Sequence, residues 1–361
     1  MPNPRNNNEP NEQLASTQAQ GPLNPNWRSK PKRSLIQAEE YITGILSGDR
    51  VLLSQAITLI ESKQAKHQAL AHEIIEACLP HSGNSIRIGI TGVPGVGKST
   101  FIEALGQNLS ANGHKLAVLA IDPSSQISKG SILGDKTRMA KLAVDPNVYI
   151  RPSAAGDSLG GVARKTRETL ILCEAAGFDT LIIETVGVGQ SEVAVHSMVD
   201  FFLLLLLPGA GDELQGIKRG IVEMADLIAV NKADGDNQAK AKRAVADYRN
   251  ALHLFPPKTS NWAVQVMTCS ALSGMGITEI WGLVEEFRRF SEANGFFQLQ
   301  RQSQARYWLH ESIQQSLREQ FYQHPQVRAL LEEKELAVQA QRQSPFHAAE
   351  DLVRLFLESK K

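Results

Sequence analysis

The 361-residue chain has no surplus of charge, no long apolar run and few cysteines. Its 38 basic and 38 acidic side chains exclude binding to nucleic acid or an anionic membrane through bulk charge. An anionic ligand must therefore be held locally. The longest apolar run, residues 201–207, falls far short of the roughly 20 residues that span a bilayer. We expect neither a membrane segment nor a nucleic-acid partner.

The scarcity of cysteine and of aliphatic residues near the N-terminus bears on location. Cys78, Cys173 and Cys269 are odd in number and far apart, which predicts buried thiols in a reducing compartment. Residues 1–34 are rich in Asn, Pro and Gln, so we expect a disordered tail. The tail lacks the apolar stretch of a secretory signal. We expect a cytoplasmic protein; because the tail is basic, a transit peptide stays an alternative.

Changes of hydrophobic pattern predict the domain organisation after this tail. Residues 35–83 have apolar side chains at helical spacing and predict an N-terminal helical segment. Residues 84–292 alternate short apolar runs with helical stretches, and residues 293–361 return to helical spacing. Prolines divide this last segment into three expected helices. Internal packing and a dimerisation arm are both open interpretations of that segment.

Short apolar runs within residues 84–292 predict the strands of a parallel sheet. The runs are residues 86–90, 116–121, 148–150, 181–183, 202–207, 227–230 and 264–267. Several are apolar at consecutive positions, as strands buried on both faces are. We therefore expect an α/β fold, a doubly wound and mainly parallel sheet with helical N- and C-terminal extensions.

The sharpest motif is GVPGVGKS at residues 92–99, which fits GxxxxGK[ST] between an expected strand and an expected helix. Glycines let backbone amides and a helix N-terminus surround a phosphate. Lys98 is expected to reach the β- and γ-phosphates, and the Ser99 hydroxyl to bind Mg²⁺. The expected phosphate-binding residues are Gly92, Val93, Pro94, Gly95, Val96, Gly97, Lys98, Ser99 and Thr100.

A second motif, NKAD at residues 231–234, follows an expected strand and matches the guanine-reading pattern NKxD. A carboxylate at Asp234 accepts hydrogen bonds from the guanine ring N–H and amine, which adenine does not offer. Ser270, Ala271 and Leu272 follow the last expected strand and resemble the backbone contact to the guanine carbonyl. Together with the phosphate-binding loop, these residues predict GTP and GDP as ligands.

The strand at residues 181–183 ends in an acid, Glu184, with Gly187 three positions further on. In GTPases with Asp and Gly at this spacing, the acid lies near Mg²⁺ and the glycine amide senses the γ-phosphate. Glu184 is one methylene longer than Asp, and Val188 rather than Gln follows the glycine. We therefore expect slow intrinsic hydrolysis.

Single residues give weaker signals. Asp122 and Asp135 follow the second expected strand, where a carboxylate suits Mg²⁺ and a cap or turn role is equally open. For Lys218 a solvated helix face is the favoured interpretation, and a phosphate-facing role is the alternative. Cys78 and His81 have metal-ligand spacing without a second pair nearby, which favours a core cysteine and a loop histidine.

The chain resembles the MeaB/ArgK family of methylmalonyl-CoA-mutase-associated GTPases in GVPGVGKST, IDPSS, GSILGDKTRM, RPSAAGDSLGGVARKTRE, IIETVGVGQSE and PGAGDELQGIKRGI. The resemblance covers residues 86–290 and extends to the flanking helices. It implies the fold of the SIMIBI class of P-loop GTPases and phosphate contacts at residues 92–100. It implies Mg²⁺ chemistry at Ser99, Asp122, Asp135 and Glu184, and guanine contacts at Asn231, Lys232 and Asp234.

The resemblance also implies a function. The family works as a homodimer through C-terminal helices and acts as a chaperone that protects an adenosylcobalamin-dependent acyl-CoA mutase and gates its cofactor. The resemblance further implies that residues 211–220 form a third switch and that Lys218 is functional. Two alternatives stay open: an ATP-dependent transport-system kinase, and a GTPase metallochaperone, against which the scarcity of Cys and His counts.

Overall fold

The computed structural model describes residues 37–121, 139–152, 159–185, 191–209 and 219–359. The contacts within the chain separate Met1–Gln37 from a compact unit, Ala38–Lys361, which contains every element described below. Its strands are β1 (Ile86–Gly92), β2 (Leu116–Ile121), β3 (Val148–Arg151), β4 (Thr180–Thr185), β5 (Phe201–Leu206), β6 (Leu227–Val230) and β7 (Gln265–Thr268). They form one parallel sheet in the order β3-β2-β4-β1-β5-β6-β7, which confirms the predicted fold class.

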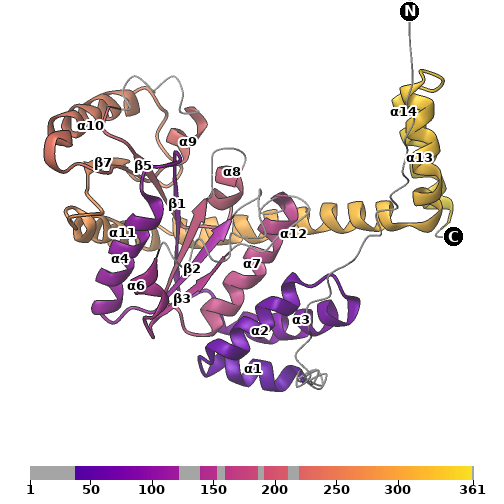
Figure 1. Ribbon diagram of the computed structural model, residues 1–361, viewed down its shortest axis with the longest axis horizontal. Helices are drawn as coiled ribbons and strands as arrows, with labels where there is room; N and C mark the ends of the chain where they lie inside the picture. Colours follow the sequence, from indigo (N-terminus) through magenta and orange to yellow (C-terminus); the bar gives the residue numbers. More distant parts are fainter. Residues whose placement is uncertain (1–36, 122–138, 153–158, 186–190, 210–218, 360–361) are drawn as a thin grey trace, which may run out of the picture. The chain divides into compact units, whose positions relative to one another are not determined.

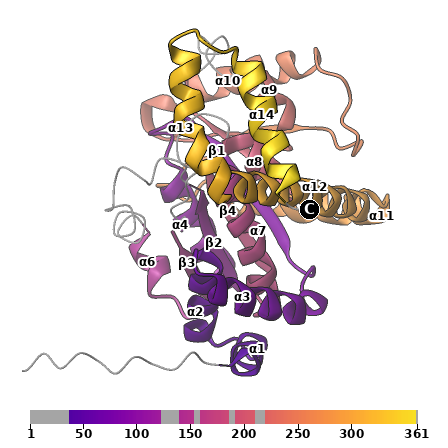
Figure 2. The ribbon, with the colours of Figure 1, turned by 90° about the vertical axis from the view of Figure 1, so that its right-hand side faces the viewer.

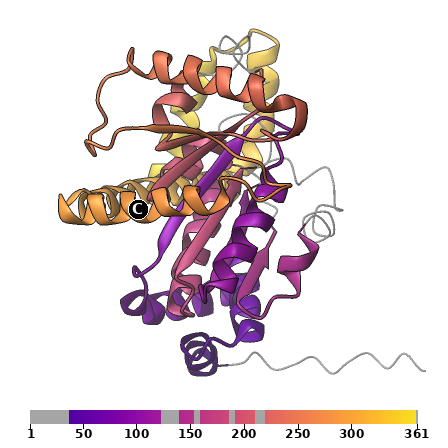
Figure 3. The ribbon, with the colours of Figure 1, turned by 90° about the vertical axis from the view of Figure 1, so that its left-hand side faces the viewer.

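Helices cover both faces of the sheet (Figures 1 and 3). One face carries α4 (Lys98–Ala111), α6 (Ala140–Ala143) and α11 (Ile277–Ala293). The other carries α7 (Leu159–Ala175), α8 (Ser191–His196), α9 (Arg219–Met224) and α10 (Gln238–Leu252). Short 3₁₀ turns, η1 (Leu79–His81) and η3 (Gly235–Asn237), join elements.

Burial on both faces explains why the strands are apolar at consecutive positions. In β5, Leu203 and Leu205 pack into the core formed with α4 and α11, whereas Leu204 and Leu206 pack against α9 and α10. Side chains alternate between the two faces of a strand, so a doubly covered strand needs apolar residues throughout. The expected strands at 116–121 and 227–230 have the observed bounds, and the others shift by one or two residues.

The predicted N-terminal helical residues form α1 (Ala38–Leu46), α2 (Arg50–Glu61) and α3 (Ala65–Cys78). The side chain of Asp49 accepts hydrogen bonds from the first amides of α2, which fixes where that helix begins. Leu53, Ile57 and Ile60 form a buried stripe on α2, as their spacing predicts. The three helices pack with one another and against α7.

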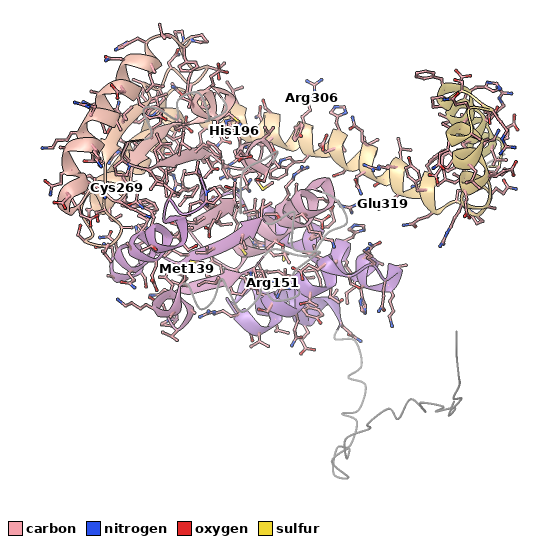
Figure 4. The ribbon with its side chains drawn as sticks, turned by 45° about the horizontal axis from the view of Figure 1, so that its top comes forward. Met139, Arg151, His196, Cys269, Arg306 and Glu319 are labelled. Carbon is pink, nitrogen blue, oxygen red and sulfur yellow. The ribbon has the colours of Figure 1, made fainter. Side chains whose placement is uncertain are left out.

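The predicted C-terminal helices are α12 (Phe296–Gln323), α13 (Pro325–Gln339) and α14 (Pro345–Glu358). Proline occupies the first position of α13 and of α14, where its missing N–H costs no helical hydrogen bond. Figure 2 shows α13 and α14 side by side, and Val327, Leu352 and Phe356 form a small core with the end of α12. Arg306 of α12 is exposed and points away from the sheet (Figure 4).

Two expectations from composition can be compared with the described residues. All three cysteines are buried and free, as predicted. Among the described helices, none combines the length and apolar character needed to cross a membrane. The tail at residues 1–34 lies outside the described part of the chain.

Candidate functional site

The glycine-rich loop leaves the end of β1 and leads into α4, which begins at Lys98. Gly92 has φ 153°, and a Cβ there would collide with the carbonyl oxygen of Leu205 on β5. Gly97 has φ 95°, and a Cβ there would lie 2.9 Å from Asn231 Nδ2. Both positions therefore require glycine. The loop ends at the N-terminus of α4, whose free amides favour an anion.

Lys98, Ser99 and Glu184 lie together at this edge of the sheet. Lys98 Nζ donates a hydrogen bond to the carbonyl oxygen of Gly92 at 2.8 Å. Ser99 Oγ donates to Glu184 Oε1 at 3.2 Å. The register of the sheet produces this meeting, because Glu184 of β4 lies opposite Ile90 of β1, two residues before the loop. The three residues predicted to carry phosphate and metal chemistry are thus neighbours.

A second buried acid, Glu192 in the first turn of α8, was not predicted. Burial lowers the pKa of the Lys98 ammonium, and the negative charges of Glu184 and Glu192 oppose that shift without cancelling it. Glu192 is therefore close enough to act on the loop lysine. Its spacing holds a signal: Val195, three positions further on in α8, is apolar and buried too, which puts both residues on the inner face of the helix.

Asn231 joins the glycine-rich loop to the end of β7. Its Nδ2 donates to the Val96 carbonyl oxygen at 2.9 Å, and its Oδ1 accepts from the backbone amide of Ala271 at 3.0 Å. Ser270 Oγ donates to Asp234 Oδ1 at 2.8 Å, which fixes one oxygen of that carboxylate. The two segments predicted to contact guanine therefore hold each other in place.

The outer residues of the predicted site are accessible. Pro94, Gly95, Thr100 and Lys232 are exposed, and Leu272 is 84% exposed. A flexible ligand can therefore reach the loop from solvent. The remaining predicted residues, Asp122, Asp135, Gly187 and Lys218, lie outside the described part of the chain.

The weak Cys78–His81 signal has a plain structural interpretation. Cys78 is fully buried at the end of α3, where burial raises the pKa of its thiol to about 11, and His81 is exposed. A thiol with a raised pKa is a poor metal ligand because the thiolate binds metal. Within the described residues, no group of three or more His, Cys, Asp or Glu side chains is arranged to hold a metal ion.

A glycine-rich loop before a helix, an acid at the end of the neighbouring strand and a paired NKAD segment define a P-loop protein of the GTPase type. The chain belongs to the MeaB family: the family model described as "Methylmalonyl Co-A mutase-associated GTPase MeaB" matches residues 53–326. The protein is accordingly a GTPase, and GTP and GDP are the nucleotides of its family.

Named relatives cover most of the chain. A Caulobacter vibrioides protein named "Putative GTPase" is 51% identical over 312 residues, covering 86% of this chain and 95% of the relative. The mouse "Methylmalonic aciduria type A homolog, mitochondrial" is 46% identical, covering 88% and 79% respectively. The crystal structure of a "LAO/AO transport system kinase" superposes with a TM-score of 0.70 and 38% identity, covering 90% and 100%.

Proposed function

We propose that this GTPase is a nucleotide-controlled chaperone of an adenosylcobalamin-dependent acyl-CoA mutase, which it protects and whose cofactor loading it gates. The family description, which names methylmalonyl-CoA mutase, supports the choice of partner. The observation that supports control by a nucleotide is the pairing of Ser99 with Glu184 and of Ser270 with Asp234 along one edge of the sheet. In the proposal, the first pair lies by the phosphates and the second pair lies by guanine.

We assign the roles within the site by chemistry. Backbone amides of residues 92–100 hold the phosphates, and the Lys98 ammonium neutralises charge on the β- and γ-phosphates. Asp234 reads the guanine N–H and amine, Asn231 and Lys232 position the base edge, and Ser270, Ala271 and Leu272 approach its carbonyl. Gly187 is the expected sensor of the γ-phosphate.

The Ser99–Glu184 pair fits Mg²⁺, because two oxygen atoms 3.2 Å apart can both serve as ligands of a hard cation. Ser99 and Glu184 would hold the ion, with Asp122 and Asp135 as further proposed ligands. When bound, Mg²⁺ supplies positive charge that stabilises the negative charge of the phosphate oxygens. Glu184 orients the Ser99 hydroxyl, and Lys98 and Lys218 are the proposed cationic contacts of the transferred phosphate.

The nucleotide acts on the partner through a difference between two states. Loops ordered by the γ-phosphate relax after hydrolysis. A ligand biases a partner only as far as its affinities for two conformations differ, so the GTP and GDP forms must present different surfaces. Slow intrinsic hydrolysis gives the GTP form time to act.

Activity tests the phosphate assignment. Lys98→Ala should abolish GTP hydrolysis, because the loop then lacks its cation. Lys242→Ala removes an exposed lysine of α10 and should leave the rate unchanged. Hydrolysis by Lys98→Ala at the wild-type rate would contradict the assignment.

Binding to the mutase tests the partner. The full chain loaded with GDP or with a slowly hydrolysed GTP analogue should co-elute with purified methylmalonyl-CoA mutase, to different extents in the two states. It should also prolong mutase activity during turnover. Absence of binding and of protection in every nucleotide state would remove the mutase from the proposal.

We further propose that the chain forms a homodimer through its C-terminal arm, residues 293–361. Leu309, Ile313 and Leu317 of α12 are spaced at four residues and are 59%, 46% and 54% exposed, so they form an apolar stripe. A second copy would cover this stripe. Ile313→Asp should convert a dimer to a monomer in sedimentation experiments; a wild-type monomer would contradict the proposal.

One similar crystal structure is that of a protein named as a kinase, which keeps an ATP-dependent kinase as the alternative. A guanine-reading Asp234 argues against it, because adenine would leave that carboxylate unpaired. Phosphate transfer from ATP to a protein, with indifference to GTP, would support the kinase and contradict the GTP-controlled chaperone.

A further inference from the structure

Polar side chains of α12 hold the segment that directly follows α8. These side chains, which we call the α12 seam, are Gln300, Arg301, Gln304 and Trp308. Gln300 Nε2 and Gln304 Nε2 donate to the carbonyl oxygen of Val199 at 3.2 and 2.7 Å. Trp308 Nε1 donates to the carbonyl oxygen of Ser197 at 3.0 Å. The backbone directly after α8 is therefore attached to side chains of α12 by hydrogen bonds.

Arg301 gives the seam a fixed point. Its Nε and Nη2 donate to the two carboxylate oxygens of Asp200 at 2.5 and 2.6 Å, and its Nη1 lies 3.3 Å from Glu174 Oε1. Asp200 also accepts from the backbone amide of Arg87 at 2.8 Å. A bidentate, buried ion pair of this kind is costly to break, so α12 is anchored at the start of β5.

Next to this anchor, the seam is incompletely hydrogen-bonded. Gln300 Oε1 and Gln304 Oε1 are buried without a hydrogen-bond partner among the described residues, and so is Nε of Arg167 on α7. The Arg167 guanidinium lies over the rings of Tyr307 and Trp308, at 5.6 and 5.8 Å from their centroids. A buried polar atom without a partner is costly, so a small shift of α12 that gives these atoms hydrogen-bond partners would be favourable.

The other end of α8 reaches the nucleotide site. Glu192, in the first turn of α8, is buried, and its charge acts on Lys98 of the glycine-rich loop. The helix packs against β1, which leads into that loop, and against β4, which carries Glu184 next to its last residue. Because α8 spans only residues Ser191–His196, less than two helical turns separate Glu192 from the end of the helix. A displacement of Glu192 would therefore move the segment that the seam holds.

We propose that the α12 seam couples the nucleotide site to the C-terminal helices: exchange of GTP for GDP shifts α8, and Gln304 and Trp308 pass the shift to α12. This inference rests on the proposed function, since it needs the nucleotide in the glycine-rich loop. Gln304 and Trp308 are positioning residues that touch no substrate. Coupling of this kind requires a two-state element that both sites bias, and in the proposal the incompletely hydrogen-bonded seam is that element.

Trp308 is a built-in probe of the seam. In the full chain labelled with 5-fluorotryptophan, which has four tryptophans, Trp308→Phe and Trp281→Phe identify the ¹⁹F resonances of these two residues. Trp281 lies on α11, against His114 and away from the seam, and serves as the internal control. With Mg²⁺ present, the Trp308 resonance should differ between the GDP form and the form with a slowly hydrolysed GTP analogue. The Trp281 resonance should stay in place.

Matched variants test whether the bonds of the seam transmit the change. Gln304→Leu removes the bond to Val199 at similar volume and should abolish the nucleotide-dependent shift of Trp308. Gln302→Leu makes the same change at an exposed position of α12 and should retain the shift. A shift that persists in Gln304→Leu would overturn the inference.

Calorimetry on the same samples separates the two possible failures. Nucleotide binding with an unmoved Trp308 resonance would overturn the seam alone. Absence of GTP and GDP binding would overturn the proposed function and the seam with it. Binding by Gln304→Leu also establishes that this variant is folded.

Discussion

Consecutive helices α11 and α12 are attached to the α/β domain in different ways. On α11, four of the five buried residues are apolar and the fifth is Ser291. The ring of Phe287 meets those of Phe201 and Trp262 edge-on, with centroids 5.1 and 5.4 Å apart. On α12, the buried side chains are Phe297 and Gln304. A close-packed apolar contact has one good arrangement, whereas a polar contact can exchange partners. The comparison indicates a fixed helix followed by an adjustable one.

The largest expected effect on stability lies in α11. Phe287→Ala should lower the free energy of unfolding by about 4 kcal/mol, because it leaves a cavity between β5 and α11. Phe290→Ala, at a neighbouring position that is 37% exposed, should cost clearly less. Urea denaturation of both variants measures the difference. Equal losses of unfolding free energy would show that apolar packing of Phe287 does not hold α11 on the domain.

Arg301 is the strongest attachment of α12. Arg301→Met should cost about 3 kcal/mol, because Asp200 stays buried without its bidentate partner. Arg306→Met removes an exposed arginine of the same helix and should change stability by less than about 0.5 kcal/mol. If urea denaturation finds the two variants equally stable, the ion pair of Arg301 with Asp200 does not hold the first turns of α12 in place.

The ion pairs of Glu174 with Arg87 and Arg301 make the free energy of unfolding depend on pH. Burial alone would raise the pKa of Glu174, but Arg87 and Arg301 outweigh it and hold that pKa at about 2. The group favours folding fully above its ordinary pKa of about 4.3, and this contribution is lost as the pH falls towards about 2. This one group changes the free energy of unfolding by at most about 1.4 kcal/mol per pH unit. Glu174→Gln should flatten the loss of stability in this window; an unchanged slope would contradict the assignment.

The smallest effect is expected inside the seam. Gln304→Leu loses one hydrogen bond and one unpartnered oxygen, so the unfolding free energy should change by no more than about 1 kcal/mol. Thermal unfolding beside Phe287→Ala provides the scale. A loss as large as that of Phe287→Ala would make Gln304 part of the core rather than of an adjustable interface.

The sequence was sufficient to predict the sheet and to place the two proposed nucleotide-binding motifs after strands of that sheet. Runs of apolar residues predicted each strand, and the glycine-rich loop and NKAD follow strands that the fold brings to one edge. The seam was not predictable, because Gln304 and the Val199 carbonyl are 105 positions apart and no periodicity reports such a contact. Spacing likewise predicted α12 as a helix without showing that Leu309 and Ile313 would be exposed.

The central claim is that a carboxylate held by Ser270 selects guanine. Calorimetry should find that wild type prefers GTP to ATP and to xanthosine triphosphate, and that Asp234→Asn loses about 100-fold in GTP affinity while gaining affinity for xanthosine triphosphate. Asp236→Asn, at an exposed neighbouring position, should bind all three nucleotides as wild type does. Unchanged GTP affinity in Asp234→Asn would contradict the claim.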